Sequence, residues 1–254
     1  MLLFALFAAV PLRADDVPSF EKILLPVVAR DSIAGAGGQF RTLVHAYSPR
    51  PCRVLGAYFS GSVYPSGELM HGPGTLTVDL PDKSRAYGRF IYVERACADQ
   101  VSIGLVVYSN AGPVAIPVAR ERDWRRGETQ FLGAEFDFRN LTDPAARLKL
   151  RFFDADGTGS GEVVATAYVS VVNSGAPIHV KLDRRDGEDA GSPFYGELDI
   201  PYPCIRITHN QPDCLGFEIR VEVVPLSPGL RYWALLTSTD NTPTQHIFAP
   251  LPQP

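Results

Sequence analysis

The chain reads Ile23-Leu24-Leu25-Pro26-Val27-Val28-Ala29-Arg30 near its start, and this form returns as Val114-Ala115-Ile116-Pro117-Val118-Ala119-Arg120. Each stretch places an apolar triplet before a proline, small apolar residues after it, and an arginine at its end. The two prolines are 117 − 26 = 91 positions apart. Gln39-Phe40 likewise recurs as Gln130-Phe131, at 130 − 39 = 91. Recurrence at a fixed offset predicts two tandem copies of one β-rich unit.

Two further similarities occur in the same order along the chain. Val78-Asp79-Leu80-Pro81 resembles Leu198-Asp199-Ile200-Pro201, at an offset of 198 − 78 = 120. Ile91-Tyr92-Val93-Glu94 resembles Ile219-Arg220-Val221-Glu222, at 219 − 91 = 128. The offset never decreases, as insertions in the second copy would produce. Because each match is short, coincidence is the alternative to a duplication.

The domain boundaries follow from these offsets. The turn-rich segment Ser109-Asn110-Ala111-Gly112-Pro113 separates the two copies. We therefore expect a first β-sandwich module over residues 22–111 and a second, with insertions, over residues 114–248. The proline-rich residues 249–254 are expected to form a flexible tail.

Composition limits the class of protein. A chain of 254 residues accommodates one large domain or two ordinary ones, and its 45% hydrophobic content is sufficient for real cores. Glycine and proline, at 22 each, favour many turns and few long helices. The formal net charge of −4 argues against a general nucleic-acid binder, which is usually basic.

Strand patterns dominate the chain. Residues 147–152 and 177–182 alternate polar and apolar side chains with period two, which is typical of a half-buried strand. Residues 88–93, 101–108, 163–172 and 217–224 are further runs rich in β-branched and aromatic residues. Turn clusters separate these runs at the spacing of a sandwich or barrel, and no segment of ten residues has a clear helical period. The sequence predicts an all-β fold.

The first 14 residues resemble a secretory signal peptide. An apolar run covers residues 1–10, and cleavage is expected after Ala14. No basic residue precedes the run, and a start codon placed too late would explain that; a buried first strand is the alternative. No later segment is apolar enough to anchor in a membrane. We expect a chain that does not span a membrane and is secreted, periplasmic or located at the cell surface.

Four cysteines fit an oxidising compartment and permit three pairings. Cys52 and Cys97 lie in the first module, and Cys204 and Cys214 lie in the second. Pairing within each module is therefore the prediction. The spacings do not match those of zinc sites.

Residues 154–162, which read Asp-Ala-Asp-Gly-Thr-Gly-Ser-Gly-Glu, alternate oxygen ligands with glycines and could hold calcium through Asp154, Asp156 and Glu162. The alternative is a hairpin turn between two strands. Ala165 stands where the helix–loop–helix calcium pattern requires its closing glutamate. No other cofactor is indicated.

Candidate ligand-binding and catalytic residues are few. Trp124, Tyr195 and Tyr202 lie in or near predicted loops and could stack on sugar rings, although aromatic residues more often fill a core. Glu135 and Asp137 would share one strand face about 7 Å apart, and glycoside hydrolysis uses a carboxylate pair. No nucleophile elbow is present. The charged run at residues 120–126 is expected to be a solvated strand end.

Residues 230–246 carry a resemblance to a family. They contain the pair Trp233-Ala234, a Thr/Asn-rich turn and the pair Thr244-Gln245. This segment resembles the closing strands of uncharacterised secreted β-sandwich proteins of soil-type bacteria, whose modules also open with an apolar–Pro–Val strand. The resemblance implies tandem immunoglobulin-like sandwiches and secretion, and it carries no active residues. Pro243 departs from the pattern.

We therefore predict a non-catalytic, secreted or surface-displayed β-sandwich protein with a binding or structural role. The partner is unknown, with an extracellular glycan or a cell-surface protein as the candidates. The alternative is a carbohydrate-binding or carbohydrate-active protein that uses loop aromatics and carboxylates. An accessory subunit of a larger extracellular assembly is a third interpretation.

Overall fold

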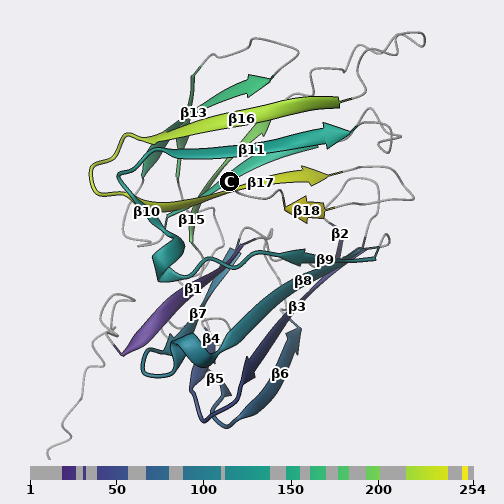
Figure 1. The fold of residues 1–254 in the computed structure, drawn as a ribbon, viewed down its shortest axis with the longest axis vertical. Helices are drawn as coiled ribbons and strands as arrows, with labels where there is room; N and C mark the ends of the chain where they lie inside the picture. The colour runs from purple at the N-terminus through teal and green to yellow at the C-terminus, as the bar shows by residue number, and fades with distance from the viewer. Residues whose placement is uncertain are drawn as a thin grey trace, which may run out of the picture.

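Antiparallel strands make up nearly all of the described chain (Figure 1). The computed structural model describes residues 19–26, 31–32, 39–56, 67–79, 88–109, 112–137, 147–154, 161–169, 177–182, 193–200, 216–239 and 248–250. Within these residues the strands form four antiparallel sheets, which we number I to IV. The predicted all-β class is confirmed.

Strands β1 to β9 form the first sandwich. Sheet I has the strand order β1-β7-β4-β5, with bounds Phe20–Pro26, Gly88–Glu94, Val54–Gly56 and Gly67–Met70. Sheet II has the order β2-β3-β8-β9, with bounds Asp31–Ser32, Gln39–Ser48, Ser102–Ser109 and Gly112–Ile116. β6 (Gly74–Asp79) also pairs with β3.

Strands β10 to β18 form the second sandwich. Sheet III has the order β10-β17-β12-β15, with bounds Arg125–Arg126, Arg231–Thr239, Arg147–Asp154 and Phe194–Ile200, and β18 (Phe248–Pro250) also pairs with β17. Sheet IV has the order β11-β16-β13-β14, with bounds Gln130–Asp137, Gly216–Pro225, Glu162–Val169 and Ile178–Lys181.

The two sandwiches have the same strand connectivity. Taken in chain order, β1 and β3 to β9 occupy the sheet positions that β11 to β18 occupy in the second sandwich. The two-residue β2, which pairs with β3 in sheet II, has no counterpart among the described residues of the second sandwich. Apart from it, the chain crosses from one sheet to the other at every connection except two hairpins in each sandwich, β4–β5 and β8–β9 in the first and β13–β14 and β17–β18 in the second. Crossing connections between two packed antiparallel sheets define immunoglobulin-like sandwiches.

This connectivity corrects the repeat predicted from the sequence. Pro26 ends β1, whereas Pro117 follows β9 in the segment that joins the sandwiches. Gln39 begins β3, whereas Gln130 begins β11, the counterpart of β1. These two matches are therefore coincidental. The other two similarities do fall on equivalent strands, β6 with β15 and β7 with β16.

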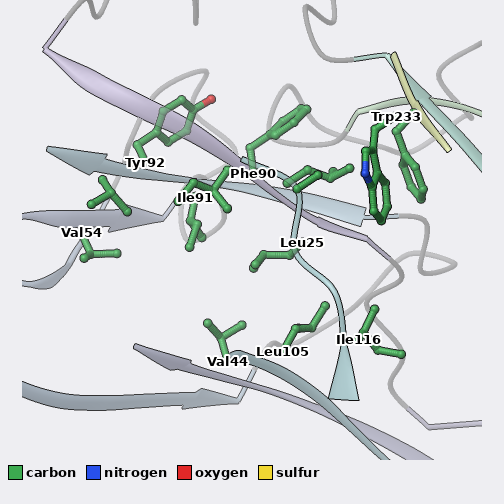
Figure 2. Close-up of a cluster of buried hydrophobic side chains, with 14 of the residues drawn as sticks. Leu25, Val44, Val54, Phe90, Ile91, Tyr92, Leu105, Ile116 and Trp233 are labelled. Carbon is green, nitrogen blue, oxygen red and sulfur yellow. The ribbon is translucent and has the colours of Figure 1, made fainter. Parts of the chain in front are cut away.

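Each sandwich has its own interior, but the two interiors differ in extent. The second core consists of residues from sheets III and IV, with Phe152, Tyr232 and Val221 fully buried. The first core combines Ile91, Leu105 and other residues of sheets I and II with four side chains of sheet III (Figure 2). These four are Phe153, Tyr195, Trp233 and Leu235, and we call them the shared layer.

Helical structure is limited to two short 3-10 segments in the described residues, η2 (Ala98–Gln100) and η3 (Glu121–Asp123). No helix within the described ranges is long and apolar enough to cross a membrane. The predicted signal peptide lies outside the described residues. Of the predicted flexible tail, Ala249 and Pro250 belong to β18, which pairs with β17, and the remaining residues lie outside the described ones.

That the two modules are independent domains stays a prediction. The predicted start of the second module at residue 114 is corrected, because Val114 and Ile116 belong to β9, which pairs with β8 in sheet II.

Candidate functional site

The segment of residues 117–124, which we call the connector, leaves β9 and lies along β1. Two backbone hydrogen bonds fix it there, from the Leu24 N–H to the Ala119 carbonyl at 2.8 Å and from the Ala119 N–H to the Leu24 carbonyl at 3.0 Å. Ala119 is fully buried. The connector is therefore part of the first sandwich and is not a free linker.

Arg120 holds the connector to sheet I by charge. Its guanidinium lies 2.8 Å from the Glu21 carboxylate, and only 11% of either side chain is exposed. The same guanidinium donates hydrogen bonds to the carbonyls of Ala98 and Val101. A largely buried ion pair stabilises a structure when further hydrogen bonds satisfy its remaining groups, as they do for Arg120.

Glu121 makes the second charged attachment. Arg95 donates to both of its carboxylate oxygens at 3.0 Å, and the Lys22 N–H donates at 3.1 Å. Partial burial acts to raise the pKa of Glu121, but the hydrogen bonds and the nearby positive charge outweigh burial and lower it. The hydrogen bond to Glu121 raises the pKa of Arg95. The pair stays ionised at neutral pH.

Trp124 covers the outer side of sheet I at the end of the connector. Its ring centroid lies 6.4 Å from that of Phe90, and Lys22 Nζ lies 4.1 Å from the centroid of the same Phe90 ring. The residues 120–126 were predicted to be a solvated strand end, and this is wrong for Arg120, Glu121 and Trp124, which are attached to sheet I. The pattern of polar and apolar residues within this segment did not predict its contacts with β1 and β7, which are distant in sequence.

The shared layer lies on the outer face of sheet III. Phe153 pairs directly with Tyr195 on β15 and with Trp233 on β17, so the three rings lie on one face. Their centroids are 5.4 Å apart for Phe153 and Tyr195, and 5.9 Å apart for Phe153 and Trp233. Figure 2 shows Trp233 in one cluster with Leu25 and Ile116 of the first sandwich. The outer face of this sheet is thus an interface.

A polar cluster adjoins the shared layer on the same face. Arg151 donates from Nε to Thr237 Oγ1 at 3.2 Å and from a terminal nitrogen to the Tyr195 hydroxyl at 2.7 Å. That hydroxyl in turn donates to Glu197 at 2.6 Å, and Arg151 and Glu197 form an ion pair at 3.7 Å. Burial, followed by the charge of Glu197, raises the pKa of Tyr195 well above its usual range. The cluster satisfies polar groups that the interface would otherwise leave without partners.

The predicted stacking residues are not exposed in this arrangement. Trp124 is 9% exposed and Tyr195 is 3% exposed, because the connector and the module interface cover them. A ring that stacks on a ligand requires an open face, so the prediction is corrected at these two positions. Tyr202 lies outside the described residues.

The predicted calcium residues lie in two different sheets. Asp154 ends β12 in sheet III and is buried, and Glu162 begins β13 in sheet IV and accepts a hydrogen bond from His179 Nδ1 at 2.7 Å. The connection between them crosses the sandwich, so the alternative of a hairpin turn is wrong. Asp156 is outside the described residues, which contain no cluster of three metal-ligating side chains. Calcium stays a prediction, tested by a melting-temperature shift with calcium and chelator.

The remaining predicted residues have mixed outcomes. Cys52 and Cys97 form a disulfide with a Cα–Cα distance of 5.8 Å, which joins the segment before β4 to the turn after β7. Cys204 and Cys214 lie outside the described residues.

Glu135 and Asp137 lie two residues apart on β11, in register with Glu218 and Gly216 of β16. A carboxylate pair with a catalytic role stays a prediction.

Comparisons with known proteins do not identify a family for this chain. No family model and no curated protein matches the chain. It is similar to the partial N-terminal region of an enterococcal surface protein at 8% identity and a TM-score of 0.27, over 91% of this chain and 88% of that one. It is similar to an anti-sigma factor domain-containing protein at 10% identity and a TM-score of 0.20, over 91% and 82%.

Neither likeness supports an argument, because both TM-scores are low. The class of protein rests on the strand topology, which is that of two immunoglobulin-like β-sandwiches. The predicted kinship with secreted bacterial proteins stays a prediction.

Proposed function

We propose that the chain is a non-catalytic, secreted or surface-displayed pair of sandwiches that acts as a structural or binding unit. One observation carries this proposal, namely the shared layer, in which aromatic residues of one sandwich complete the core of the other. Sandwiches joined in tandem usually move relative to one another unless their interface is large and hydrophobic. Two sandwiches held in a fixed relative orientation could serve as a rigid spacer or as a support that displays a binding surface.

The connector supports the same role. Its backbone hydrogen bonds and two charged attachments hold the junction between the sandwiches at β1. Small-angle scattering of the full chain is expected to fit one rigid body. A variant with Trp233→Ala is expected to give a broader distribution of shapes. A distribution for the unaltered chain as broad as that of two freely jointed sandwiches would contradict the structural role.

The compartment is part of this proposal. A disulfide such as Cys52–Cys97 persists in oxidising compartments, which supports export from the cytoplasm. The test is a fusion of residues 1–40 to a reporter enzyme that is active only after export, beside a matched fusion of residues 15–40. Export of the first fusion alone is expected. Equal activity of the two fusions would contradict the predicted signal peptide.

The non-catalytic part has a separate test. The purified chain is incubated with polysaccharides and chromogenic glycosides, and no release of reducing ends is expected. Turnover that disappears in a Glu135→Gln, Asp137→Asn variant would overturn the proposal in favour of a glycoside hydrolase. Turnover that persists in this variant would also overturn it and would place the active residues elsewhere.

A further inference from the structure

The outer face of sheet II is open to solvent across the described strands. Along β3 the buried residues Thr42, Val44 and Ala46 alternate with side chains that point outward, and β8 alternates in the same way. Tyr47 on β3 is 50% exposed and Tyr108 on β8 is 38% exposed.

These exposed tyrosines contrast with the others of the described chain. Tyr92, Tyr195 and Tyr232, whose burial is also described, are at most 3% exposed. We call the outward residues of β3, β6, β8 and β9 the tyrosine face; the four strands lie side by side in Figure 1.

Strand register fixes the layout of the tyrosine face. Tyr47 lies opposite Ser102, and Tyr108 lies opposite Arg41. The two rings are thus separated by six residues along neighbouring strands, or about 20 Å. Gly104 lies between them on β8, and a Cβ placed there would meet no atom within 4 Å. Gly104 therefore adds no side chain to the face between the two rings.

The polar groups of the tyrosine face carry no net charge. Arg41 Nε and Asp79 Oδ2 form an ion pair at 2.9 Å, so the two charges compensate each other. His45 Nδ1 and Thr77 Oγ1 are hydrogen-bonded at 3.0 Å. Among the outward residues whose burial is described, the other polar side chains are hydroxyls, such as that of Ser102, which both donate and accept hydrogen bonds. This chemistry does not attract an anionic polymer or a membrane surface, and it matches an uncharged ligand rich in hydroxyl groups.

We propose that the tyrosine face binds a neutral polysaccharide, which extends over β3 and β8 from Tyr47 to Tyr108. The two tyrosine rings offer flat apolar surfaces to the faces of sugar rings, and their hydroxyls reach the sugar hydroxyls at the edge. Gly104 adds no side chain that would obstruct the polysaccharide between the two rings. This inference rests on the proposed non-catalytic role and specifies its partner.

The test is affinity electrophoresis of the full chain in gels that contain a neutral β-glucan, dextran or arabinoxylan, with dissociation constants from calorimetry. Retardation by at least one neutral polysaccharide is expected. Tyr47→Ala and Tyr108→Ala are each expected to weaken binding about two- to twelvefold, the range for loss of one aromatic contact. Tyr47→Trp is expected to retain binding.

Phe131→Ala is the matched control, because Phe131 is 44% exposed and lies on the second sandwich. Binding that survives in the Tyr47→Ala, Tyr108→Ala double variant would overturn the inference. Retardation by heparin or alginate alone, or by none of the polysaccharides, would overturn it as well. Self-association that both tyrosine variants abolish would instead identify the face as a dimer contact. Release of reducing ends is measured in a separate assay. Hydrolysis would contradict the proposed non-catalytic function, but it would not contradict binding at the tyrosine face.

Discussion

The two sandwiches have the same connectivity but differ in what covers their sheets. In the first, β7 is buried on both faces, with Ile91 and Val93 toward sheet II and Phe90 and Tyr92 on the other side. In the second, sheet III is the one buried on both faces, because its outer side is the shared layer. An antiparallel sheet commonly leaves one face to water.

The difference shows how one topology serves two purposes. The second sandwich closes its own core and also supplies aromatic rings to its neighbour. The first sandwich depends on its neighbour at the shared layer beside Leu25, while its own connector covers Phe90. The first sandwich should therefore be the more sensitive of the two to changes at the junction.

The largest expected effect comes from Phe152 and Phe153, neighbours on β12 that are both fully buried but belong to different cores. Replacing either by alanine should reduce the free energy of unfolding by about 3–5 kcal/mol. Phe153→Ala should speed amide hydrogen exchange in β1 and β9 of the first sandwich, whereas Phe152→Ala should act mainly within the second. Identical exchange patterns for the two variants would contradict the shared layer.

Removal of the disulfide should follow in magnitude. Cys52 and Cys97 are 45 residues apart, and loss of a crosslink over a loop of this length costs about 2–4 kcal/mol. The double variant Cys52→Ala, Cys97→Ala should lose this stability in the first sandwich while Val221 and Val223 retain their exchange protection. An equal loss of protection in both sandwiches would show that they unfold as one unit.

Gly88→Ala probes the closeness of the two sandwiches. Gly88 has a φ of +150°, and a Cβ there would lie 3.1 Å from the Leu25 carbonyl oxygen of its own sandwich, 3.2 Å from Pro193 Cγ and 3.3 Å from Phe153 Cε1 of the other. We expect a loss of about 2–3 kcal/mol, from backbone strain together with crowding at the junction. Gly74 is the matched control, since its φ is +138° with open space around it. Equal losses at the two glycines, measured by denaturant unfolding, would exclude crowding.

The smallest effect concerns Glu121 and pH. Its folded pKa is below the ordinary value of 4.5, so the stability it contributes is present above pH 4.5 and is lost as pH falls through the folded pKa. Glu121→Gln should cost about 0.5–1 kcal/mol at neutral pH and flatten the acid side of the stability profile. Glu128→Gln is the control, because the ion pair of Glu128 with Arg125 is exposed and 3.8 Å long, and it should cost less stability at neutral pH than Glu121→Gln. A profile unaltered by Glu121→Gln would show that the attachment to Arg95 adds nothing to stability.

Local patterns in the sequence predicted the strands, because the alternation of side chains is a property of each strand alone. The intra-module pairing of Cys52 with Cys97 was predictable for a similar reason, since both lie in one module. The repeat was predicted in outline, but Pro26 and Pro117 were matched wrongly, because apolar–proline pairs are common and occur in unrelated positions.

The junction could not be predicted, because distant contacts decide it. The alternation in residues 147–152 indicated that Arg151 faces water, yet Arg151 is 8% exposed beneath the first sandwich. Its partners Tyr195 and Thr237 are 44 and 86 positions away. Tyr195 was predicted to lie in or near a loop, because the residues that bury it are distant in sequence. No local signal distinguishes an outer sheet face that meets water from one that meets another module.

Burial of β12 on both sides affects how the protein can be divided. A truncated version that ends at β9 would lose Phe153, Trp233 and Leu235 together, and Leu25 and Ile116 would then face water. Such a fragment should expose an apolar patch and aggregate. A version that begins at β10 would retain the second core but would expose the shared layer on the outer face of sheet III. The two halves should therefore be produced together, because each covers an apolar face of the other.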